Sequence, residues 1–158
     1  MRKIFTRSWF VLIASASVLW LFGTTPAKGG LMPKKHVKEQ IAEAISNARS
    51  GESSTARTQA AEHLADLTSG AGAKEVDEKT IGEIISLLDT SDDSVRYWVA
   101  RCLGNLGSRA KAAIPNLERI LTEVDCVQGS KTSASGIRFA LAQMGVSPPP
   151  PKCEGTKP

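Results

Sequence analysis

Apolar residues in the middle of the chain recur with the spacing of helices. In the segment 81–88, isoleucine and leucine fall at i, i+3, i+4 and i+7, which places them on one face of a helix. The segments 94–106 and 110–124 show the same spacing, and Gly107 follows the second one where a helix terminus is expected. Helices of this length are marginally stable alone. We therefore expect each of them to bury its apolar face against another helix.

The same spacing predicts three more helices, at about residues 34–50, 53–68 and 132–144. Their inward positions are Val37, Ile41, Ala44, Ile45, Ala48, Ala56, Ala60, Leu64, Leu67, Ile137, Ala140, Leu141 and Met144. The chain is 41% hydrophobic but only 5% aromatic, which suits a single domain with an aliphatic core. The predicted fold class is therefore all-α.

An internal repeat organises these helices. A pair of leucines three residues apart begins at Leu64 and recurs 39 residues later at Leu103. It recurs again 38 residues later at Leu141, with methionine as its second member. A period near 40 residues accommodates two helices and two turns. We predict a short α-solenoid of three antiparallel helix pairs at 34–68, 80–107 and 110–145, with a compact six-helix domain as the alternative.

The middle pair carries a more specific pattern. An acid lies in the turn at Asp92, a Val-Arg pair follows at Val95 and Arg96, small residues recur along the helix, and an Ile-Pro pair begins at Ile114. This pattern resembles the HEAT repeat, a family in which stacked helix pairs serve as binding scaffolds. The resemblance implies that Asp92 and Arg96 have a structural role and hydrogen-bond the neighbouring repeat. The third pair has Ala134 in place of Arg96, as terminal repeats are often atypical.

Residues 1–27 have the pattern of a secretory signal peptide. Three basic residues precede an apolar run at 9–22, and small residues follow up to Ala27. The run is shorter than the roughly 20 residues of a membrane span. We expect cleavage after Ala27, an exported periplasmic or secreted protein, and no membrane association afterwards. An uncleaved N-terminal anchor is the alternative. The predicted domains are the signal peptide 1–27, a leader 28–33, the repeat domain 34–145 and a Pro-rich tail 146–158.

The basic character of the chain comes largely from its first residues. The formal net charge is +4, and residues 1–27 contribute three basic residues and no acid. The remaining chain is therefore close to neutral. This balance is poor support for nucleic-acid binding, and we expect no nucleic-acid partner.

The cysteines fit an oxidising compartment. Cys102 lies on the apolar face of its helix and is expected in the core. Cys126 lies before the last helix and Cys153 follows the Pro-rich segment, so we predict a Cys126–Cys153 disulfide. The histidines are far from the cysteines in sequence and no C-x-x-C is present, so no metal site is expected.

The outward side of the second helix in each pair is the candidate binding surface. In the HEAT family this helix lines the concave side of the solenoid. The positions opposite the buried stripe, with their equivalents in the other pairs, are Glu62, Asp66, Tyr97, Arg101, Asn105, Phe139 and Gln143. Tyrosine and arginine are enriched at protein interfaces. We predict a shallow face that binds a protein or peptide, with Trp98 at its core-side edge. A solvated face without a ligand is the alternative.

Motifs of enzymes are absent from the sequence. It contains no phosphate-binding loop, no G-x-S-x-G and no H-E-x-x-H. We expect no catalytic residues and no cofactor, and a monomeric scaffold. Two other roles stay open: a lyase-like or enzyme-accessory HEAT protein, which would need titratable groups in a deep cavity, and a structural envelope protein without a ligand on the concave face.

Overall fold

The computed structural model describes residues 34–124 and 129–149. These residues form helices joined by turns, and no strand occurs among them. The α-helices are α1 (Lys34–Ser50), α2 (Ser54–Leu67), α3 (Glu78–Ser86), α4 (Asp93–Leu106), α5 (Ile114–Val124) and α6 (Ser133–Gln143). Short 3-10 helices occupy η1 (Gly70–Glu75), η2 (Leu87–Asp89) and η3 (Gly107–Ala113).

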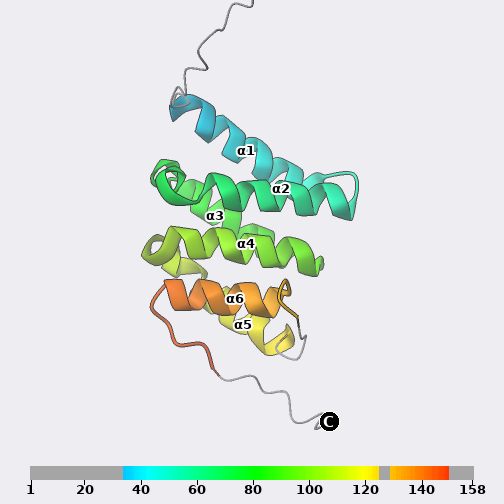
Figure 1. The fold of residues 1–158 in the computed structure, drawn as a ribbon, viewed down its shortest axis with the longest axis vertical. Coiled ribbons are helices and arrows are strands. Elements are labelled where there is room, and N and C mark those ends of the chain that lie inside the picture. The colour runs from blue at the N-terminus through cyan, green and yellow to red at the C-terminus, as the bar shows by residue number, and fades with distance from the viewer. Residues whose placement is uncertain (1–33, 125–128, 150–158) are drawn as a thin grey trace, which may run out of the picture. The chain divides into compact units, whose positions relative to one another are not determined.

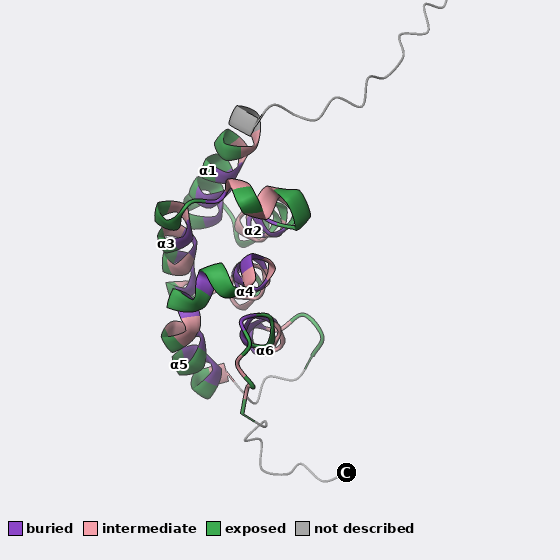
Figure 2. Ribbon diagram, turned by 90° about the vertical axis from the view of Figure 1, so that its left-hand side faces the viewer, coloured by how far each residue is buried: buried purple, intermediate pink, exposed green. Residues whose placement is uncertain are grey.

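The helices form two layers. Figure 2 shows α1, α3 and α5 in one layer and α2, α4 and α6 in the other. Within the second layer α4 lies between α2 and α6 and packs against both (Figure 1). Consecutive helices pair as α1–α2, α3–α4 and α5–α6. The prediction of an all-α fold built as a short HEAT-like solenoid is therefore confirmed.

The core runs through the stack and is aliphatic. The repeated leucines Leu64, Leu103 and Leu141 are each fully buried, one on every helix of the second layer. Alanines such as Ala61 and Ala100 fill the space between them. Small residues let neighbouring helices approach closely, so the core needs no aromatic side chain.

The helix predicted at 110–124 begins later than the apolar spacing suggested. The 3-10 helix η3 covers Gly107–Ala113, with non-helical torsion angles at Ala110, and α5 starts only at Ile114. Pro115 explains the boundary, because proline has no N–H to bond the preceding turn and is accepted only near a helix start. Gly107 itself has a φ of +56°, which glycine adopts without steric cost.

One predicted core position is wrong. Ala56 is exposed at the start of α2, although Val95, 39 residues later, is buried. Helix α2 is the first of its layer, so no second-layer helix of the described chain precedes it in the stack as α2 precedes α4 (Figure 1). His63 is exposed for the same reason, whereas Cys102 at the equivalent position of α4 is completely buried. A polar outer side is what a terminal repeat requires.

Two glycines set the distance between α4 and α6. A Cβ on Gly136 would lie 2.8 Å from the carbonyl oxygen of Tyr97, which is backbone and cannot rotate away. A Cβ on Gly104 would lie 2.6 Å from Cε1 of Phe139 and 3.1 Å from Cα of Ala140. Only glycine therefore allows these two helices their present approach.

Several predictions concern residues outside the described part of the chain. The signal peptide 1–27, the leader 28–33 and both cysteines of the predicted Cys126–Cys153 disulfide lie there. Of the Pro-rich tail, residues 146–149 are described, and Arg138 of α6 donates a hydrogen bond to the carbonyl of Pro149. Among the described helices, none combines the length and the apolar character needed to cross a membrane.

Candidate binding face

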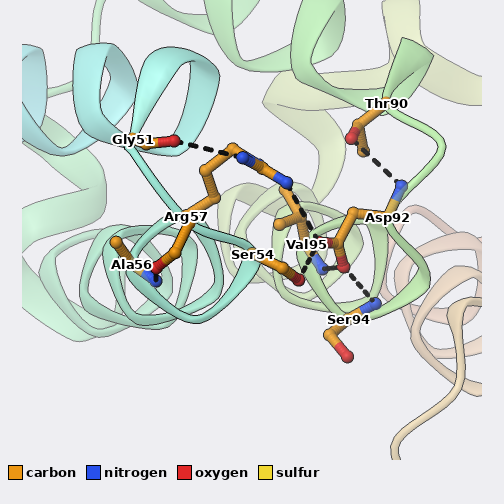
Figure 3. Close-up of polar contacts among 9 residues, drawn as sticks. Gly51, Ser54, Ala56, Arg57, Thr90, Asp92, Ser94 and Val95 are labelled. Atoms are coloured by element: carbon orange, nitrogen blue, oxygen red, sulfur yellow. Dashed lines mark hydrogen bonds and ion pairs between the residues drawn. The ribbon is translucent and has the colours of Figure 1, made fainter.

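The start of α4 is joined to α2 through Asp92. Its carboxylate caps α4 by accepting hydrogen bonds from the amides of Ser94 and Val95, at 3.1 and 3.3 Å. The other carboxylate oxygen accepts from the hydroxyl of Ser54 and lies 3.7 Å from the Arg57 guanidinium, both on α2 (Figure 3). One side chain thus starts a helix and ties it to its neighbour.

The environment of Asp92 favours its charged form. Partial burial opposes ionisation, but the hydrogen bonds from Ser54 and from the two amides, together with the charge of Arg57, outweigh it. The pKa of Asp92 is therefore lowered from its ordinary value. A lowered folded-state pKa stabilises the fold above the unfolded-state value, and the contribution is lost as the pH falls through the folded-state pKa.

We expect Asp92→Ala to lower the free energy of unfolding by about 2 kcal/mol near neutral pH, since it removes both a helix cap and a hydrogen-bond acceptor. The difference from the parent should shrink as the pH falls below about 4, where the unfolded carboxylate takes up its proton. Urea titrations across this range measure it. Asp89→Ala is the control, because Asp89 is exposed and its pair with Arg119 contributes little. A difference that stays constant down to pH 2 would contradict this role of Asp92.

The neighbouring residue joins α4 to the opposite side. Asp93 accepts hydrogen bonds from the amide of Ser133, at 3.3 Å, and from its hydroxyl, at the start of α6. Adjacent aspartates therefore connect α4 to α2 and to α6. Arg96 differs from the role that the resemblance implied, because its guanidinium donates to the carbonyls of Leu88 and Thr90 in its own helix pair. Arg96 therefore stabilises the turn before α4 and does not bond to the neighbouring repeat through these donors.

The predicted partner-binding residues all lie on helices of the second layer. Glu62, Tyr97, Arg101, Asn105 and Phe139 are half-buried, and Asp66 and Gln143 are exposed. We call these seven residues the second-helix face. They come from α2, α4 and α6, which lie side by side in Figures 1 and 2.

Asn105 has a structural bond that the sequence did not suggest. Its side-chain amide donates to the carbonyl of Ala65 on α2 at 2.9 Å, so the second-helix face is partly tied to the scaffold there. Beneath it, the buried Thr68 hydroxyl lies 3.2 Å from the sulfur of Cys102. Burial raises the pKa of the Cys102 thiol to about 12 despite the hydrogen bond from Thr68. Cys102 is thus a neutral core residue.

The aromatic residues of α4 and α6 make two sets of contacts, each of which includes a cation. The Arg101 guanidinium carbon lies 3.8 Å from the centre of the Phe139 ring. The Tyr97 and Trp98 rings meet edge to face with their centres 4.9 Å apart, and the Lys131 ammonium is 5.6 Å from the Trp98 ring centre. We call these five residues the aromatic–cation cluster. The sequence pattern placed Tyr97, Arg101 and Phe139 on the face. It missed Lys131, because that residue lies in the turn before α6, where helical spacing gives no information.

Two small cavities lie in the described part of the chain. A cavity of about 150 Å³ lies between α1 and α3, and another of about 180 Å³ is bordered by Arg49, Arg57 and Ser86. Both are smaller than typical ligand pockets, which begin at roughly 300 Å³. Within the described residues, no group of three or more His, Cys, Asp or Glu side chains is placed to hold a metal ion.

Comparison with known families gives a match to the family model described as HEAT repeats over residues 41–130. That range covers more than half of the chain and includes the α2–α4 junction and most of the second-helix face. Neither the curated proteins nor the solved structures contain a significant match. The family match agrees with the stacked helix pairs and the 40-residue period, and this chain belongs to the HEAT-repeat family.

Proposed function

We propose that this HEAT-repeat protein is a scaffold that binds another protein or a peptide through the second-helix face. The observation that carries the proposal is the distribution of aromatic residues. Beyond residue 27 the sequence contains only three, Tyr97, Trp98 and Phe139. All three are half-buried, and all three belong to the aromatic–cation cluster.

This distribution is unusual for a folded domain. Aromatic side chains bury more area than any others and commonly contribute to the core. Here the core is made mainly of leucine, isoleucine, valine and alanine, and all three rings are only partly buried, with Trp98 packed against the edge of the core. Clustered rings beside an arginine are typical of the anchor residues of protein interfaces. The helical scaffold thus has a surface suited to protein contact.

The two alternative roles have less support. A lyase-like or enzyme-accessory role requires a pocket with converging titratable groups, whereas the described cavities are small. A structural envelope role gives no reason to keep aromatic rings on one face. We therefore favour a non-catalytic scaffold that needs neither metal nor cofactor.

We further propose that the scaffold works outside the cytoplasm, in the periplasm or after secretion, and acts as a monomer. The support is the charge and apolar pattern of residues 1–27. N-terminal sequencing of the protein recovered from expressing cells tests the export. A mature chain that begins at residue 28 is the expected result, and a chain that retains residues 1–27 in the cytoplasmic fraction would contradict it.

The binding proposal is tested by affinity capture from an envelope extract. Replacing Tyr97, Arg101 and Phe139 together by alanine should weaken partner capture at least tenfold. The reason is that truncating an anchor residue commonly costs about 2 kcal/mol or more of binding free energy. Circular dichroism and urea titration show whether the variant remains folded. The matched control is Lys79→Ala with Glu83→Ala, an exposed pair on α3 in the other layer. Unchanged capture by the folded triple variant would contradict the proposal.

A further inference from the structure

We infer that the second-helix face binds a carboxylate of its protein or peptide partner through Arg101. This inference rests on the proposed function and names the chemistry that the face recognises. It is carried by the position of one arginine among all the arginines that the structure describes.

Six of the seven described arginines donate hydrogen bonds to the protein itself. These are Arg49, Arg57, Arg96, Arg109, Arg119 and Arg138. Arg101 is the exception, since within the described residues its guanidinium forms no hydrogen bond and no ion pair and has Phe139 as its contact. A guanidinium carries five N–H donors, and at this site none of them is used by the described part of the fold.

The contact with Phe139 orients the Arg101 guanidinium before a ligand binds. A cation above a ring is held by the ring's electrostatic field, and guanidinium groups commonly stack this way. A side chain that already rests on a ring loses less conformational entropy when a ligand arrives than one that is free in solvent. The planar guanidinium has parallel N–H groups along one edge, and these can hold a carboxylate by two parallel hydrogen bonds. The arrangement suits an acidic side chain or a peptide C-terminus.

The surrounding charges support the same ligand. Lys131 lies over the Trp98 ring and supplies a second positive charge. Glu62 occupies the position on α2 that Arg101 occupies on α4, yet the two form no ion pair, and Arg101 contacts Phe139 on α6 instead. Tyr97 and Trp98 on α4 supply an apolar contact, with their rings packed edge to face. An acidic peptide that carries two carboxylates and an apolar residue matches these groups.

The test uses the full chain with Trp9→Phe and Trp20→Phe, so that Trp98 is the only tryptophan and reports binding by its fluorescence. The probes are two end-blocked peptides with Glu-Leu-Glu or Gln-Leu-Gln at their centre and Gly-Ser flanks. We expect the Glu peptide to bind at least tenfold more tightly, with an affinity that falls as salt screens the charges. Arg101→Gln should abolish this preference. Arg101→Lys should retain only part of it, because an ammonium group cannot donate two parallel hydrogen bonds to a carboxylate as a guanidinium does.

Two further variants make the result specific. Arg49→Gln removes a surface arginine of the first layer and should leave the affinity unchanged, while Glu62→Gln should tighten binding by removing a nearby negative charge. Equal binding of the two peptides, full affinity in Arg101→Gln, or no binding of the Glu peptide at millimolar concentration would overturn the inference. If both peptides bind equally and Phe139→Ala abolishes that binding, recognition of a carboxylate is refuted, while the second-helix face remains a peptide-binding site.

Discussion

Replacing Leu103 by alanine is expected to lower the free energy of unfolding by about 3 kcal/mol, the middle of the range for buried leucines. Leu103 is completely buried in α4, and α4 is held on both sides by α2 and α6. Beside this position Asn105 is bonded to Ala65 of α2 and Gly104 already packs closely against α6, so little further closure of the helices is available to fill the space. Urea denaturation followed by circular dichroism measures the loss.

The matched control is Leu67→Ala on α2. Leu67 is only half-buried and lies in the first helix of the second layer, so we expect a cost of about 1 kcal/mol from the smaller area removed from water. Equal losses in the two variants would show that α4 is not the central member of the stack. A loss below 1 kcal/mol in Leu103→Ala would lead to the same conclusion.

Replacing Gly136 by alanine is expected to destabilise the fold by about 2 kcal/mol, although alanine is the better helix former. The new Cβ would lie 2.8 Å from the Tyr97 carbonyl oxygen and 3.2 Å from the Tyr97 Cα, both backbone atoms. Helix α6 would have to move away from α4, which would also disturb the aromatic–cation cluster. Thermal and urea unfolding measure the effect.

Gly82→Ala provides a control with the opposite sign. Gly82 is exposed within α3 and no atom lies within 4 Å of a Cβ built there. Alanine should therefore stabilise the protein by up to about 1 kcal/mol through its better helix propensity. Stabilisation by both substitutions would mean that α4 and α6 do not approach as closely as described.

The sequence predicted the helices and their repeat well because both depend on local spacing. Each buried stripe is complete within one helix, and the leucines at positions 64, 103 and 141 are fully buried. The start of α5 was less predictable, because apolar spacing continues through 110–113 while Pro115 moves the α-helical start to Ile114. The exposure of Ala56 depends on its place at the end of the stack, which spacing within a helix does not reveal.

The candidate site was predictable only as a set of positions. The repeat identified which residues lie opposite the buried stripe, among them Arg101 and Phe139. Their stacking depends on how closely α4 approaches α6, and that distance is set by Gly104 and Gly136. The bond from Asn105 to α2 likewise crosses between repeats. Contacts of this kind require the packed structure, because the residues are about 40 positions apart in sequence.

The most direct measurement for the whole account is amide hydrogen exchange of the chain with and without its captured partner. If the second helix of each pair presents the binding surface, slower exchange should concentrate in α2, α4 and α6, around residues 62–66, 97–105 and 139–143. Slower exchange confined to α1, α3 and α5, with α2, α4 and α6 unchanged, would contradict the account.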